Sequence, residues 1–98
     1  MESNAMKKTK RDKMVAELKE LGLKDDDFAH QSWCVSGLAL CTEGSNSHLV
    51  GNYWMAGEDC HGGLYDDFGV NQEVNRIAKK YGCFTEWYNA AVLCIVEM

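Results

Sequence analysis

One segment of this chain gathers the side chains that could support chemistry. Within residues 58–67, EDCHGGLYDD, a thiol, an imidazole and several carboxylates follow one another closely. Cys60, His61, Asp59 and Asp66 carry the donor atoms that bind metal ions. Adjacent Cys-His is not zinc-finger spacing, however, and neighbouring carboxylates disfavour a reactive thiolate. A metal- or thiol-dependent site centred on Cys60-His61 is therefore the alternative function, ranked below a binding role.

The rest of the chain has no catalytic or nucleotide-binding motif. Gly62-Gly63 and Gly69 lack the strand, lysine and serine or threonine context of a phosphate loop. The basic residues 7–13 have no interleaved aromatic residues, so they are interpreted as a solvated helix start. We therefore expect no enzyme activity, no cofactor and no direct contact with nucleic acid.

Charge is distributed unevenly along the chain. Residues 6–24 carry seven basic and three acidic side chains, whereas residues 25–98 carry three basic and eleven acidic ones, and the net charge is −5. An acidic body attracts basic partners, although it also simply keeps a protein in solution. One hypothesis is mimicry of nucleic acid toward a basic, nucleic-acid-handling protein. The acidic residues that would present this surface are Glu58, Asp59, Asp66, Asp67 and the cluster 25–27.

Aromatic residues supply the second set of candidate contacts. Trp33, Tyr53, Trp54, Trp87 and Tyr88 all fall on expected strands, and they are more than one small core readily buries. Trp and Tyr dominate binding hot spots, so the last four are predicted interaction residues. The chain is therefore predicted to be a small non-enzymatic binding or regulatory protein. By analogy of class alone, it suits an acidic inhibitor or accessory protein of phage or mobile-element type.

Cysteine usage and hydropathy indicate a cytoplasmic protein. The five cysteines are odd in number and have no CxxC spacing, so they are interpreted as core thiols in a reducing compartment. No apolar run is long enough to span a bilayer, and no secretory signal precedes the domain. Residues 1–5 resemble the remnant of a cleaved expression tag, which leaves residues 6–98 as a single domain.

Two helices are expected where apolar residues recur at helical spacing. They cover residues 10–21 and 71–81, and each ends before a glycine that can adopt the left-handed conformation. Thr9 and Asp12 have the spacing of a capping box at the start of the first helix. Residues 57–69 break all periodicity and are predicted to form a loop held to the core by Leu64, Tyr65 and Phe68.

Four strands are expected from β-branched and aromatic runs. Residues 33–42 and 91–96 are apolar on both faces and are predicted to be inner strands, with a bulge or a close backbone approach at Gly37. Residues 48–56 are predicted to complete one hairpin and residues 84–88 to begin the other. The predicted fold is α+β, with two helices on a four-stranded, mainly antiparallel sheet in the order αββαββ. Since two helices cover only one face of such a sheet, a homodimer through the sheet is also predicted.

Overall fold

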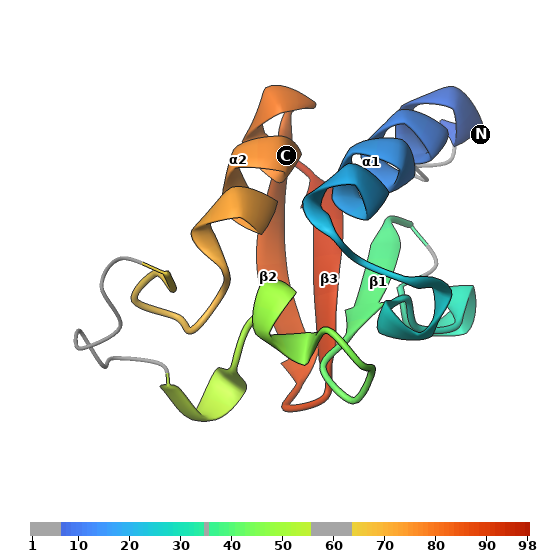
Figure 1. Cartoon of the computed structure of the whole chain (residues 1–98). Helices are drawn as coiled ribbons and strands as arrows, with labels where there is room; N and C mark the ends of the chain where they lie inside the picture. The colour runs from blue at the N-terminus through green and yellow to red at the C-terminus, as the bar shows by residue number, and fades with distance from the viewer. Residues whose placement is uncertain (1–6, 35, 56–63) are drawn as a thin grey trace.

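The computed structural model describes residues 7–34, 36–55 and 64–98, and in them two helices pack on an antiparallel sheet (Figure 1). The α+β class is therefore confirmed, but the sheet has three strands in the described part, not four. β3 lies in the centre, with β1 and β2 antiparallel to it on either side. The elements are α1 (Lys8–Leu21), β1 (Leu38–Cys41), α2 (Gln72–Lys80), β2 (Cys83–Asn89) and β3 (Val92–Glu97).

Helix α1 starts without the expected capping box but ends as expected. Its N-cap is Lys7, which makes no side-chain capping bond, and Asp12 pairs instead with Lys8 at 2.8 Å between Oδ2 and Nζ. At the other end the Gly22 N–H donates to the Leu18 carbonyl with φ at +132°, a conformation that favours glycine. The Leu18 carbonyl also accepts a hydrogen bond from the Leu23 N–H, so two backbone donors close the last turn.

Helix α2 begins and ends within one residue of its predicted bounds. The Asn71 side chain accepts a hydrogen bond from the Glu73 N–H, which satisfies one of the free amides of the first turn. The helix stops at Lys80, and Gly82 follows with φ at +73°. The Asn71 side chain is itself buried and donates a hydrogen bond to the His48 carbonyl, so the start of α2 is fixed to the segment around His48.

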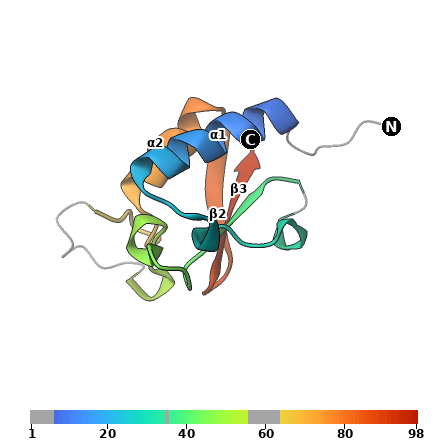
Figure 2. The ribbon, with the colours of Figure 1, turned by 45° about the vertical axis from the view of Figure 1, so that its right-hand side comes forward.

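Both helices lie on one face of the sheet and form the main core there (Figure 2). The opposite face has a smaller buried cluster under the short 3-10 helix η2 (Gln31–Trp33) and the residues beside it. The main core contains Met14, Leu18, Leu23, Leu38, Leu40, Val50, Val70, Val74, Ile77, Ala78, Cys83, Leu93 and Ile95. The smaller cluster contains Cys34, Ala39, Val92 and Cys94. Two helices therefore cover one face only, and the second face is closed in part.

The prediction of a strand at residues 48–56 is wrong for residues 48–55, which are the part of this range that the structure describes. This part forms two 3-10 helices, η3 (Ser47–Leu49) and η4 (Tyr53–Met55), and one isolated bridge from Gly51 to Val70. The physical reason is competition for the edge of β1. That edge is already taken by the preceding segment, where the Ala29 N–H donates to the Ala39 carbonyl at 3.0 Å. A hairpin partner would have needed the same backbone groups.

The strand predicted at residues 33–42 is shorter than expected and lies at an edge. Only Leu38–Cys41 pairs with β3, so its interpretation as an inner strand is wrong. The predicted inner strand at 91–96 is confirmed as β3. The close approach at Gly37 is confirmed too, because a Cβ there would lie 2.1 Å from the Ile95 carbonyl oxygen.

Leu64 and Phe68 do not hold the loop to the core, contrary to expectation: their side chains are 43% and 70% exposed. Within the described residues, neither helix combines the length and the apolar character that crossing a membrane demands.

Candidate functional site

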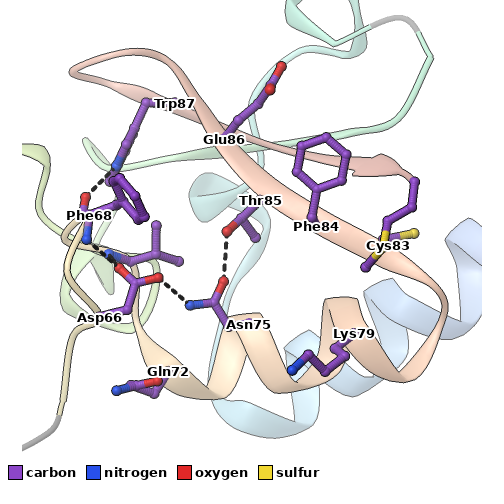
Figure 3. Close-up of a pocket in the computed structure, with 12 residues that line it drawn as sticks. Asp66, Phe68, Gln72, Asn75, Lys79, Cys83, Phe84, Thr85, Glu86 and Trp87 are labelled. Carbon is purple, nitrogen blue, oxygen red and sulfur yellow. Dashed lines mark hydrogen bonds between the residues drawn. The ribbon is translucent and has the colours of Figure 1, made fainter.

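A groove of about 640 Å³ runs along the outer edge of β2 (Figure 3). Its walls are the strand itself, one side of α2 and the turn that precedes α2. The lining side chains are Asp66, Phe68, Val70, Gln72, Asn75, Lys79, Cys83, Phe84, Thr85, Glu86, Trp87 and Met98.

The register of β2 on β3 shows which backbone groups face this groove. The Met98 N–H donates to the Gly82 carbonyl at 3.2 Å, so these two residues form a hydrogen-bonded pair. Such pairs alternate along an antiparallel ladder, which directs the backbone groups of Phe84 and Glu86 toward β3. The residues that alternate with these direct their backbone N–H and C=O groups outward, and no strand of the described part pairs with those groups. These outward-facing residues are Cys83, Thr85 and Trp87.

The other edge of the sheet is not open in the same way. Along β1, the Ala29 N–H donates to the Ala39 carbonyl, and Phe28 forms a bridge with Leu40. Proteins commonly cover or disrupt an edge strand, because its free N–H and C=O groups are a template for another strand. In the described part, β2 is thus the edge at which a strand can be added.

A hydrogen-bond chain holds the floor of the groove (Figure 3). The Thr85 hydroxyl donates to Asn75 Oδ1 at 2.6 Å, and Asn75 Nδ2 donates to Asp66 Oδ2 at 2.6 Å. Asp66 Oδ1 accepts the backbone N–H groups of Phe68 and Val70 at 2.8 and 2.9 Å. The turn, α2 and β2 are therefore fixed relative to one another, and the groove is formed before any ligand arrives.

Three of the predicted aromatic residues meet at the hairpin end of the groove. The rings of Tyr53 and Trp54 make an edge contact at 5.4 Å, and those of Tyr53 and Trp87 make one at 5.6 Å. Trp54 is 77% exposed, whereas Trp87 is half-buried and donates its Nε1–H to the Phe68 carbonyl at 2.7 Å. Trp87 thus joins this aromatic cluster to the groove wall.

The fourth predicted aromatic residue, Tyr88, points to the opposite face of the sheet. Its ring contacts that of Trp33 at 5.4 Å, and both side chains are largely exposed. Phe84 alternates with Trp87 and Thr85 along β2, which places it on the same face as Tyr88. The aromatic candidates therefore divide between two surfaces, one at the groove and one on the open face of the sheet.

Two exposed charges of opposite sign stand at the rims of the groove. Glu86 projects from β2 and Lys79 from α2 (Figure 3), and among the described residues neither makes an ion pair. A ligand in the groove can therefore meet both charges without breaking an internal pair.

The acidic candidates do not form one exposed cluster in the described part. Asp66 uses one carboxylate oxygen for the turn and the other for Asn75 of α2, and Asp27 is fully buried. Asp25 pairs with Lys19 at 2.9 Å, while Asp67 is exposed. The first two are therefore committed to internal hydrogen bonds, which leaves less acidic surface for mimicry than the sequence suggests. Glu58 and Asp59 lie outside the described residues.

The metal hypothesis rests mainly on residues that the structure does not describe. Cys60, His61 and Asp59 lie outside the described part, and the fourth candidate, Asp66, is engaged as a hydrogen-bond acceptor. Within residues 7–34, 36–55 and 64–98, no group of three or more potential ligands comes together.

Sequence reasoning did not select most of the residues that line the groove as site residues, among them Phe68, Asn75, Lys79, Phe84, Thr85 and Glu86. The available signal was the pair of polar residues Thr85 and Glu86 between the aromatic residues of β2. Comparisons with known proteins add no assignment: no family model, no curated protein and no solved structure matches this chain.

Proposed function

We propose that this protein is a non-enzymatic binding module that takes an extended segment of a partner protein as an added strand along β2. The observation that carries the proposal is the free backbone edge at Thr85 beside a preformed groove. Strand addition is a common mode of peptide recognition, in which main-chain hydrogen bonds give affinity and flanking pockets give specificity.

The groove also defines the chemistry of the partner. Side chains of an added strand alternate between the side of α2 and the open face of the sheet. On the open face, Phe84 and Glu86 favour a segment with an apolar residue near a basic one. On the other side, Lys79 accommodates an acidic or polar residue, and Phe68 offers an exposed apolar contact. The net charge of −5 favours a basic partner on approach.

The decisive experiment replaces the donor that an added strand needs. Because the Thr85 N–H faces outward, Thr85→Pro removes it and leaves the pairing with β3 in place, as proline is tolerated at such edge positions. Thr85→Val is the matched control, since it keeps the N–H and loses only the hydroxyl bond to Asn75. Linear random peptides selected by display on the wild-type protein serve as the probe.

We expect a selected synthetic peptide to shift the backbone amide resonances of Cys83, Thr85 and Trp87. Its affinity should be retained in Thr85→Val and fall by roughly tenfold or more in Thr85→Pro, which corresponds to the loss of one main-chain hydrogen bond. The proposal fails if both variants, each shown to be folded by circular dichroism, bind equally well. It also fails if the shifted resonances lie away from β2.

Within this proposal the partner is a basic, nucleic-acid-handling protein, and the chain acts on it as an acidic inhibitor or accessory factor in the cytoplasm. The four cysteines of the described part are free thiols, which suits a reducing compartment. Binding that depends on charge weakens with ionic strength. An affinity for a selected peptide that does not change between low and high salt would argue against the electrostatic part of the proposal.

We also propose a homodimer through the open face of the sheet. Trp33, Phe84 and Tyr88 are 44%, 40% and 60% exposed there, an unusual amount of aromatic surface for a small domain. Light scattering after size exclusion should give twice the chain mass of 11.0 kDa, and Tyr88→Glu should return the monomer. A wild-type mass that stays at that of one chain on concentration would refute the dimer.

A further inference from the structure

Two buried cysteines lie together on the face of the sheet opposite the helices. Cys34 follows η2, and Cys94 lies in the middle of β3; they are 7% and 5% exposed and belong to the same small cluster. Cys94 Sγ also approaches the Trp33 carbonyl at 3.8 Å, so the residue before Cys34 contacts the same thiol. Both thiols are free.

We propose that Cys34 and Cys94 are a reversible oxidation site that closes to an intramolecular disulfide by exchange with a small-molecule disulfide such as glutathione disulfide. In the first step a Cys34 thiolate attacks one glutathione sulfur, forms a mixed disulfide and releases one glutathione thiol. In the second step Cys94 loses its proton and attacks the Cys34 sulfur, which releases the second glutathione thiol. The two cysteines are oxidised by two electrons, and glutathione disulfide is reduced by two.

The order of these steps follows from where each thiol lies. Burial, with a contribution from the Cys34 thiol itself, raises the pKa of Cys94 to about 12, so this thiol is protonated at neutral pH. Cys34 lies outside the sheet, in the connection between η2 and β1, and it can become accessible without disturbing the ladder. Exchange therefore begins at Cys34 and requires opening of the η2 segment, which makes the site slow to oxidise.

The other described cysteines do not offer a comparable pair. Cys83 is buried in the main core on the opposite face, and Cys41 accepts a hydrogen bond from the Glu43 N–H at the far end of β1. A bond between Cys34 and Cys94 would fix η2 to the central strand and hold Trp33 against Tyr88. Oxidation would thereby order the open face of the sheet, independently of the β2 groove.

The test uses the whole reduced chain in glutathione buffers of increasing disulfide content. After acid quenching and alkylation, intact mass should show the loss of two hydrogen atoms, and peptide mapping should place the bridge between residues 34 and 94. The same buffers are applied during refolding from urea, so that slow opening of the native state does not hide the bond. Cys34→Ser and Cys94→Ala should each abolish the bridged species, and the oxidised wild type should melt at a higher temperature.

Three outcomes would overturn the inference. One is a bridge that joins other cysteines, one is a glutathione adduct on Cys34 that never resolves, and one is the absence of any bridge in both the native and the refolded protein.

Discussion

Removing the buried carboxylate of Asp27 should destabilise the protein more than any other single change at an acidic residue of the described part. Asp27 lies in the 3-10 helix η1 (Asp25–Asp27) and is fully buried. It accepts hydrogen bonds from the Lys24 N–H at 2.8 Å, the Asn46 N–H at 2.9 Å and the Asn46 side-chain amide at 3.0 Å. The carboxylate therefore joins the end of α1 to the turn after β1.

The expected magnitude follows from these three bonds. A hydrogen bond to a charged group contributes about 1.5–3 kcal/mol, and three on one carboxylate are not additive. We expect Asp27→Ala to cost about 3 kcal/mol, since it leaves buried donors without an acceptor. Asp27→Asn keeps the shape but turns an amide donor toward one of those donors, and should cost about 2 kcal/mol. Total stability of a domain this size is only about 5–15 kcal/mol, so both effects are large.

The effect should also depend on pH. Burial raises the pKa of Asp27, but the hydrogen bonds from Lys24 and Asn46 lower it by more, so its folded pKa lies below the unfolded value. A depressed folded pKa means that the stabilisation is complete above the unfolded pKa of about 4 and is lost as pH falls through the folded pKa. The difference between the wild type and Asp27→Asn should therefore narrow only below about pH 4.

Urea unfolding followed by tryptophan fluorescence and circular dichroism measures these differences. The urea concentration at the midpoint of unfolding should fall in both variants. The dependence of the free energy of unfolding on urea concentration should stay constant, as expected when the native fold is kept. An Asp27→Asn variant within about 0.5 kcal/mol of the wild type at pH 7 would show that the three bonds are weaker than their geometry implies.

Two further substitutions test the close contacts of this chain. Gly44→Ala should destabilise it by about 2 kcal/mol or more, because a Cβ at Gly44 would lie 2.4 Å from both the Asp26 carbonyl oxygen and Asp27 Oδ1; a midpoint in urea equal to that of the wild type would contradict this. Asn75→Ala should cost about 1–2 kcal/mol and speed amide exchange in the turn at Asp66, since it removes both side-chain bonds of the groove floor; unchanged exchange at Phe68 and Val70 would show that the turn does not need Asn75.

The sequence contains enough information for the elements whose signals are local. Both helices and the β2–β3 hairpin were predictable because helical periodicity, terminal glycines and β-branched runs all act within a few residues. The prediction of a strand at residues 48–56 was wrong for a non-local reason. Its composition suits a strand, but residues 28–29 already occupy the edge of β1 that it would have joined. The residues of the segment itself carry no sign of this competition for the edge of β1.

The groove could not be predicted for the same reason. Whether β2 is an edge strand depends on where every other strand pairs, and Asp66, Asn75 and Thr85 meet only after α2 has packed beside β2. Sequence reasoning did select Trp87, which joins the groove to the aromatic cluster, because the aromatic residues of the expected strands are more than one small core readily buries and Trp is frequent in binding hot spots.

The two binding proposals share Phe84 but depend on different groups, and this separates them experimentally. The added strand needs the outward N–H of Thr85 at the edge of β2, whereas the dimer needs the side chain of Tyr88 on the open face. Thr85→Pro should therefore weaken peptide binding by roughly tenfold or more and leave the dimer intact, whereas Tyr88→Glu should dissociate the dimer and leave peptide binding unchanged. If Thr85→Pro instead dissociates the dimer, the second copy of the chain supplies the strand that pairs with the edge of β2. A peptide must then compete with self-association for that edge. Peptide affinity would then fall as protein concentration rises, which a strand bound independently of the dimer does not predict.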